Sequence, residues 1–296
     1  MIIDSHVHYA HPKYNVEIPY LCEQDGEYSV RRADREKLIA EMRSGGIVGF
    51  IEPSIGIDEI EKQLSLVSEH DGFMWAALGV HPTRCVGVEW KRRKEIRTLA
   101  EKTKIVAIGE TGLDYHYKDD KKYRLIQKRW FAYQIKLAHR LKLPLILHVR
   151  EADGDALGIL KKYKSKLHGG VVHCFWRDYE TAKKYIELGF VIGVGGKLLC
   201  SDAQGEALSD TVKNAPLESL IVETDSPYVF PDMDEKLCKG NQGKKLCNSS
   251  LILPSVIRRI AELRGEPVEM IEDAVYRNTV RIFRLNMRGG EENGEK

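Results

Sequence analysis

Two histidines separated by one residue, His6 and His8, end the apolar run that opens the chain. Side chains of the same chemical kind end further apolar runs, and these are Glu110, His148, His173 and Asp225. Imidazole nitrogens and carboxylate oxygens ligate zinc, manganese, iron and nickel, and magnesium also accepts carboxylates. Burying several titratable groups together is costly unless a cation compensates them. The residue types therefore predict a metal centre, with the identity of the metal left open.

Six ligands are too many for one tetrahedral ion and suit two ions. We expect the first ion to take the ligands of the first and last runs: His6, His8 and Asp225. We expect the second ion to take the two later histidines, His148 and His173. The Glu110 carboxylate would bridge the ions at a separation of about 4 Å.

Eight short apolar runs must carry these side chains, and they span residues 1–8, 48–54, 73–82, 105–115, 143–150, 169–176, 190–196 and 220–228. The runs are apolar almost throughout, as parallel strands covered on both faces are. Segments with helical spacing lie between them, near residues 34–44, 58–70, 89–102, 123–141, 155–164, 178–188 and 204–214. Strands and helices in alternation predict an α/β chain folded as a (β/α)8 TIM barrel.

This barrel would gather the titratable residues at one end. Function in such barrels is located at the carboxyl ends of the strands, and residues two apart on a strand point the same way, so His6 and His8 both face the axis. The competing architecture is an open doubly wound sheet, which normally carries a glycine-rich turn after its first strand. Residues 9–14 contain no glycine.

Composition sets the outer limits. The 296 residues are 43% hydrophobic and 30% charged, and the net charge of +2 neither predicts nor excludes a nucleic-acid partner. No apolar run approaches the roughly 18 residues of a membrane span, and no secretory leader precedes the first strand. We expect a cytoplasmic protein with no membrane association and no obligate protein partner. Residues 1–287 would form a single domain, with 288–296 as a flexible tail.

Two long segments, residues 9–31 and 228–248, follow the first and last strands. Their tyrosines and lysines suit a nucleic-acid groove in which aromatic rings stack on bases, although ordinary surface loops have the same composition. The tyrosines of the first segment are Tyr9, Tyr14, Tyr20 and Tyr28. The cysteines lack CxxC spacing and most should be free thiols; those in the two segments, for which a third metal or a disulfide stays open, are Cys22, Cys238 and Cys247.

Seven motifs in order carry a family resemblance: HVH at 6, GVHP at 79, GETGLDY at 109, LHVREA at 147, VVHCF at 171, ETDSPY at 223 and NTVRIF at 278. Together they resemble the TatD family of metal-dependent hydrolases over residues 2 to about 285. The resemblance implies a (β/α)8 barrel, two divalent metal ions and activity as a deoxyribonuclease of the 3'-5' exonuclease type, or as a related phosphodiesterase on DNA. The ligands assigned above agree with the family pattern.

Two positions depart from that pattern. The glycine that commonly follows HCF is replaced by Trp176, and the usual Asn-Glu-Pro triplet after the last strand reads Asn248, Ser249, Ser250. We expect both changes to border the substrate rather than the metals, and so to affect specificity more than chemistry.

In this interpretation a water held between the ions loses its proton near neutral pH and attacks the phosphorus as hydroxide, with Asp225 as general base and Glu110 as the other catalytic carboxylate. His81 and Arg150 would bind phosphate oxygens, and Trp176 would stack on a terminal base. For Arg150, an ion pair with Glu151 or Asp153 is the alternative. Asp114 would orient a metal ligand or serve only in a turn.

Two rival classes stay open. The same metals would also serve an amidohydrolase-type esterase or lactonase, or an aminoacyl-tRNA deacylase. Many barrels of that kind bridge their ions through a modified lysine from the fourth strand, where this chain has Glu110. A non-catalytic scaffold binding nucleic acid or protein is the second rival, and it requires a broken site, whereas all six expected ligands are present.

Overall fold

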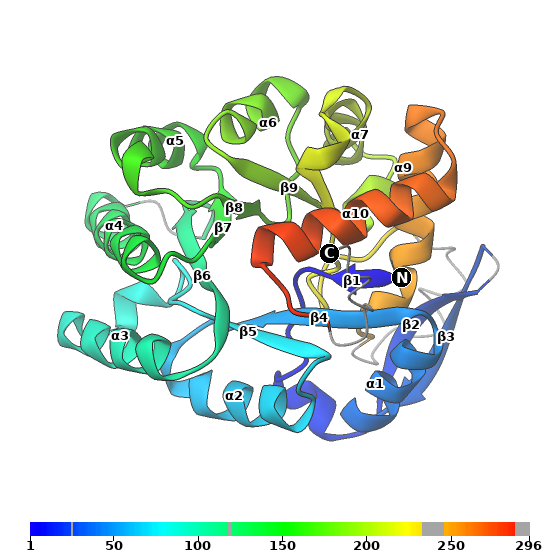
Figure 1. The fold of residues 1–296 in the computed structure, drawn as a ribbon, viewed down its shortest axis with the longest axis horizontal. Helices are drawn as coiled ribbons and strands as arrows, with labels where there is room; N and C mark the ends of the chain where they lie inside the picture. Colours follow the sequence, from blue (N-terminus) through cyan, green and yellow to red (C-terminus); the bar gives the residue numbers. More distant parts are fainter. Residues whose placement is uncertain (25, 118–119, 233–245, 288–296) are drawn as a thin grey trace, which may run out of the picture.

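The computed structural model describes residues 1–24, 26–117, 120–232 and 246–287. Eight parallel strands form its central sheet, in the order β1 (Ile2–Asp4), β4 (Ile47–Pro53), β5 (Met74–Leu78), β6 (Ile105–Asp114), β7 (Leu145–Arg150), β8 (Gly170–Val172), β9 (Phe190–Val194) and β10 (Leu220–Val222). Each predicted run supplies one strand in sequence order (Figure 1). The predicted (β/α)8 fold class is confirmed.

The two outer strands of this sheet meet beyond their ends. Within the described residues no ladder pairs β1 with β10. Instead the Ser5 N–H donates to the Val222 carbonyl at 3.0 Å, and the Asp225 N–H donates to the His6 carbonyl at 2.9 Å. These bonds bring the segments carrying His6 and Asp225 side by side, as the expected metal ligation requires.

Helices surround the sheet (Figure 1): α1 (Arg35–Ser44), α2 (Ile60–Glu69), α3 (Arg93–Lys102), α4 (Lys121–Leu141), α5 (Asp153–Lys162), α6 (Tyr179–Ile186), α7 (Ala203–Asn214), α9 (Leu253–Arg264) and α10 (Val268–Phe283). Seven of them lie where helical spacing predicted helices. Several begin at an aspartate whose side chain accepts a backbone N–H of the first turn, as Asp34 does from Lys37 and Asp178 does from Thr181. Local sequence therefore fixes where these helices begin.

The amino end of the barrel is filled by apolar side chains. Inward-facing residues of successive strands form one buried cluster with Phe283, the last residue of α10, and with Leu285, two residues later. The strand residues of this cluster include Ile3, Ile51 and Val106. Figure 1 shows α10 lying across this end, and the Asn278 amide donates to the Leu220 carbonyl at the start of β10 at 2.9 Å. The NTVRIF motif therefore closes the amino end.

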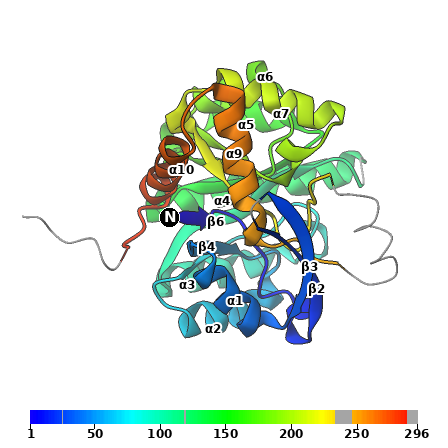
Figure 2. The same cartoon turned by 90° about the vertical axis from the view of Figure 1, so that its right-hand side faces the viewer.

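The segment 9–31 is not the loop that the sequence predicted. It contains a hairpin of β2 (Ile18–Gln24) and β3 (Glu27–Ala33), which lies on the side of the molecule away from α10 (Figure 2). Tyr9, Tyr14 and Tyr20 are fully buried, so the prediction that they stack on bases is wrong. The Asp25-Gly26 pair between two runs of strand length was the signal that could have revealed it.

The cysteines of the described segments are free, as predicted, and include Cys22 and Cys247. The Cys22 sulfur lies 3.0 Å from the Ser29 hydroxyl. Cys238, most of the segment 228–248 and the tail 288–296 lie outside the described residues. Among the helices of the described part, none is long and apolar enough to cross a membrane.

Candidate metal centre

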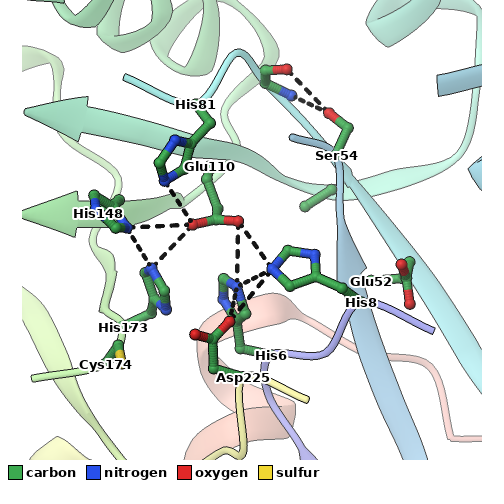
Figure 3. A network of polar contacts seen from close by, with 12 residues as sticks. His6, His8, Glu52, Ser54, His81, Glu110, His148, His173, Cys174 and Asp225 are labelled. Atoms are coloured by element: carbon green, nitrogen blue, oxygen red, sulfur yellow. Dashed lines mark hydrogen bonds and ion pairs between the residues drawn. The ribbon is translucent and has the colours of Figure 1, made fainter. Parts of the chain in front are cut away.

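Three of the predicted ligands, His6, His8 and Asp225, gather on one side of a fourth, Glu110. Glu110 Oε1 lies 3.4 Å from His6 Nε2 and 3.2 Å from His8 Nε2, and these two nitrogens are 3.3 Å apart. Asp225 Oδ1 lies 3.3 Å from the His8 nitrogen and 3.7 Å from that of His6. Figure 3 shows His6, His8 and Asp225 converging from β1 and β10 on this side of the carboxylate.

A second group surrounds the other oxygen. Glu110 Oε2 lies 3.0 Å from His173 Nε2 and 3.6 Å from His148 Nδ1, and these two nitrogens are 3.1 Å apart. His81 Nε2 is also 3.6 Å from this oxygen (Figure 3). The sequence predicted that His81 binds substrate. In the structure its ring also lies beside the Glu110 carboxylate. The two oxygens of Glu110 thus face different histidines, and the rings of His6 and His173 stack on each other at 3.9 Å.

The separations within both groups suit metal ligands. A metal–ligand bond of about 2.0–2.1 Å puts neighbouring ligand atoms about 3.0 to 3.4 Å apart in octahedral or tetrahedral geometry. Two imidazole nitrogens that face each other share one proton at most, whereas both donate lone pairs to one cation. The Nδ1 atoms of His6 and His173 are buried without a hydrogen-bond partner in the described chain. Nitrogen and oxygen donors held at these separations fit divalent cations.

Burial and charge keep most of these groups in the state that a metal needs. Burial opposes ionisation of Glu110, yet the imidazoles of His6 and His173 hold the pKa of its carboxyl well below the ordinary value. Burial and the neighbouring His6 lower the pKa of His173 to about 4. Asp225, although buried, accepts a hydrogen bond from His8 that lowers its pKa. Ionised carboxylates and a neutral imidazole are competent ligands.

His8 and His148 behave differently in the metal-free chain. Burial disfavours their charge, but hydrogen bonds to Asp225 and Glu110 hold the pKa of His8 well above its ordinary value. Asp114 and Glu110 likewise raise the pKa of His148 to about 9 against its burial. A cation bound by these nitrogens must displace their protons, so metal binding is coupled to proton release.

Asp114 orients a predicted ligand rather than serving only in a turn. Its Oδ2 lies 2.9 Å from His148 Nε2, which leaves Nδ1 facing Glu110 and His173. The Gln127 amide holds Asp114 in place, because it accepts the Asp114 N–H and donates to the Asp114 carbonyl, both at 2.8 Å. A carboxylate on the outer nitrogen of a ligand histidine is a common support of metal sites.

Three buried acids near the site were missed at the sequence level. Glu52, at the end of β4, accepts the N–H groups of Tyr9 and Ala10 at 2.7 and 3.0 Å and so holds the chain just after His8. Asp4 accepts the Thr224 hydroxyl and backbone, joining β1 to the end of β10. Glu223 accepts the Cys174 N–H. Each of these acids lies at or just after the end of a strand. The same position in an apolar run identified Glu110 in the sequence.

Five of the six predicted ligands line a cavity of about 370 Å³ at the carboxyl end of the barrel, and His6 is fully buried beside them. His81, Arg150 and Trp176 line this cavity, as predicted for residues that touch substrate. The guanidinium of Arg150 lies 5.2 Å from the ring centre of Tyr117 and 6.0 Å from that of Trp176. Glu151, the expected alternative partner of Arg150, is instead paired with His116.

The triplet Asn248, Ser249, Ser250 does not border the substrate. All three residues are fully buried, and the Ser250 hydroxyl donates to Asp4 Oδ2 at 2.7 Å. The expectation that this change borders the substrate is wrong, because the chain turns inward here and its hydroxyls satisfy a buried acid. Trp176, the other departure, does line the cavity.

A family model described as TatD related DNase matches residues 3–284. The 3'-5' ssDNA/RNA exonuclease TatD of Rahnella sp. (strain Y9602) is 33% identical over 258 residues, which cover 86% of this chain and 94% of that protein. The uncharacterized metal-dependent hydrolase YabD of Bacillus subtilis (strain 168) is 32% identical over 286 residues, covering 97% of this chain and 100% of YabD.

Solved structures give the same picture. The crystal structure of YJJV, a TatD homolog from Escherichia coli K12, matches with a TM-score of 0.79 at 28% identity and covers 96% of this chain and 98% of its own. A TatD family hydrolase from Entamoeba histolytica, at 23% identity and a TM-score of 0.75, shares the fold and covers 95% of this chain and 97% of its own.

Proposed function

This chain belongs to the TatD family of metal-dependent hydrolases, and on that premise we propose that it cleaves phosphodiester bonds in single-stranded DNA, as an exonuclease of the 3'-5' type. The Rahnella relative is named as an exonuclease of single-stranded DNA and RNA. The DNA substrate and the direction of cleavage are the parts of this proposal that follow from the relatives alone.

The arrangement of Glu110 is the observation that carries the proposal. One of its oxygens faces His6 and His8, and the other faces His148 and His173. We propose that Glu110 bridges two divalent ions, with Asp225 completing the set beside His6 and His8. When bound, such a pair of ions activates water and neutralises the charge that develops on a phosphoryl group.

The residues around these ligands perform separate tasks. Asp225 lines the cavity as an ionised carboxylate, so it is able to accept a proton from water as general base. The Thr83 N–H donates to His81 Nδ1 at 3.2 Å, which leaves the proton of the neutral imidazole on Nε2. His81 is therefore a hydrogen-bond donor toward the Glu110 side of the cavity, as suits a phosphate oxygen.

Arg150 and Trp176 would bind the substrate above the metals. Arg150 has no carboxylate partner in the described chain; its Nη1 donates to the Tyr117 hydroxyl at 3.2 Å. Its guanidinium is free to form two parallel hydrogen bonds to a phosphate, and the neighbouring indole of Trp176 offers a face to a base. We also propose that residues 1–287 act as one domain. Its first strand, β1, and its last helix, α10, contribute to the same buried apolar cluster.

Product analysis on end-labelled single-stranded DNA tests the proposal, with magnesium, manganese or zinc added in turn. We expect the wild type to shorten the strand progressively from its 3' end. Glu110→Ala should bind less metal and cleave at least about 10²- to 10³-fold more slowly, because an electrostatic stabiliser of the reaction is removed. Glu187→Ala, which removes an exposed carboxylate at the end of α6, is the control.

Two results would overturn the proposal. Glu110→Ala cleaving at the wild-type rate with full metal content would contradict the bridging role. A wild type that leaves DNA intact and hydrolyses a lactone or carboxylic ester would place the chain among esterases with the same metal ligands.

A further inference from the structure

The cations at the mouth of the cavity differ in whether a carboxylate already holds them. Arg177 lines the cavity, but its Nε donates to Asp153 Oδ2 at 3.0 Å. Lys197, close to the ring of Trp176, is paired with Asp202. A cation already paired with a carboxylate is a poor candidate to bind a further anion. Arg177 and Lys197 are therefore structural cations, not available ones.

Two available cations are not used by the proposed function. Arg84 is exposed and lines the cavity. The Lys13 Nζ lies 5.2 Å from the ring centre of Tyr228, which also lines the cavity. Neither side chain has a carboxylate partner among the residues that the structure describes. A cation left unpaired next to a site for negatively charged substrate is free to bind phosphate.

The aromatic rings at the mouth are unusual in their exposure. Among the described residues, the exposed aromatic side chains are Tyr117 and Tyr228, at 71% and 40%, and both line this cavity. Tyr228 follows Asp225 by three residues, and its N–H donates to the Asp225 carbonyl at 2.9 Å. Its ring lies 6.3 Å from the ring of His8. The turn that presents Asp225 therefore also presents an open aromatic face.

These residues follow other strands than Arg150 and Trp176 do. Lys13 follows β1, while Arg150 ends β7, four places away in the order of eight strands. Tyr228 follows β10, and Trp176 follows β8. Each group thus combines an available cation with an aromatic ring of the cavity lining.

We propose that Lys13, Arg84 and Tyr228 form a second nucleotide subsite beside His8 and Asp225, distinct from Arg150 and Trp176. In this subsite the two cations bind the phosphate next to the scissile one, and the Tyr228 ring stacks on the adjoining base. The inference rests on the proposed function and sharpens its substrate class: the enzyme engages a strand with at least two phosphates, so an oligonucleotide is a better substrate than a diester with a single phosphate.

Two substrates compared on the metal-loaded enzyme test the subsite: a single-stranded DNA oligonucleotide and methyl 4-nitrophenyl phosphate, which has one phosphate and no second base. Tyr228→Ala should raise KM for the oligonucleotide about 5- to 150-fold, the effect of losing one base stack. Tyr228→Phe keeps a ring and should resemble the wild type. For the small diester, both variants should keep kcat/KM within about twofold, because this subsite is empty when the diester binds.

Salt dependence tests the two cations separately. Each phosphate contact removed from a single strand lowers the slope of log KM against log salt by about 0.7. We therefore expect Lys13→Ala and Arg84→Ala each to show that change on the oligonucleotide and none on the small diester. Lys183→Ala, which removes an exposed lysine of α6 outside the cavity, should keep the wild-type slope.

Three outcomes would overturn the subsite. The first is equal loss on both substrates, which would mean that the variants disturb the metal centre. The second is that the Lys13, Arg84 and Tyr228 variants have the same kinetics as Lys183→Ala on both substrates. The third is a wild type that cleaves neither substrate, and this result alone would also overturn the proposed function.

Discussion

The two ends of the barrel bury opposite kinds of side chain. At the amino end, Ile3, Ile51 and Phe283 pack together with no polar partner to satisfy. At the carboxyl end, His6 and Glu110 are as deeply buried, at 0% and 2% exposure. Apolar burial contributes stability directly, whereas buried titratable groups cost stability unless they are compensated. The amino end therefore stabilises the fold, and the carboxyl end holds the side chains that are candidates for catalysis.

Removing the Phe283 ring should cause the largest loss of stability, and this loss should be confined to the amino end. Phe283→Ala leaves a cavity among inward-facing side chains and should lower the free energy of unfolding by about 3–5 kcal/mol. Metal content and activity per folded molecule should stay near the wild type, because the substituted ring lies across the barrel from the ligands. Denaturant unfolding and metal analysis measure the two effects. An equal loss of metal affinity would show that the ends are coupled.

Glu52 should make the carboxyl end sensitive to pH. Burial raises the pKa of its carboxyl to about 7, while the N–H groups of Tyr9 and Ala10 oppose that shift. Because the folded pKa is the higher one, the unfolded chain loses its proton first. The stabilisation is complete below about pH 4.5 and declines as pH rises to about 7, by about 3 kcal/mol for this group.

Denaturant unfolding of the metal-free protein between pH 4 and 8 measures this decline. Glu52→Gln removes the titrating group and should flatten the profile relative to wild type, whereas Glu187→Ala should reproduce the wild-type slope. If Glu52→Gln kept the full slope, the decline would belong to another acid of the site, such as Asp4, whose pKa burial also raises to about 7.

Asp114 should show the smallest effect, confined to the metal. Asp114→Asn keeps the shape of the side chain but weakens the acceptor opposite His148 Nε2. We expect affinity for one of the two ions to fall by about 10- to 100-fold, the usual result for the outer partner of a ligand histidine. Competition with a fluorescent chelator measures it. Unchanged affinity for both ions would assign Asp114 to the turn alone.

The sequence predicted most of the fold because its signals are local. Apolar runs of strand length, alternating with helical spacing, gave eight strands in the right order, and the family resemblance carried by the seven motifs is confirmed over residues 3–284. The hairpin of β2 and β3 was missed because the polar residues of its segment are also typical of a surface loop, although each of its strands has seven residues. Its tyrosines looked exposed, while contacts with distant segments bury Tyr20.

The site was predictable in membership and not in arrangement. Two-residue spacing turns His6 and His8 to the same side, and strand ends of a barrel converge, so the set of side chains followed from the pattern. Glu52 and Asp4 escaped notice because their partners are backbone and hydroxyl groups elsewhere in the chain. Ser250, expected near the substrate, proved to be one of those partners.

The sequence by itself determined which side chains stand at the strand ends, since strand periodicity and the order of the motifs are properties of neighbouring residues. Only the tertiary structure decided which oxygen of Glu110 faces which histidines, which cations at the mouth are left without a carboxylate, and that Tyr228 is open while Tyr9 is buried. Those outcomes depend on contacts between segments that are distant in the sequence, and such contacts exist only when the barrel has formed.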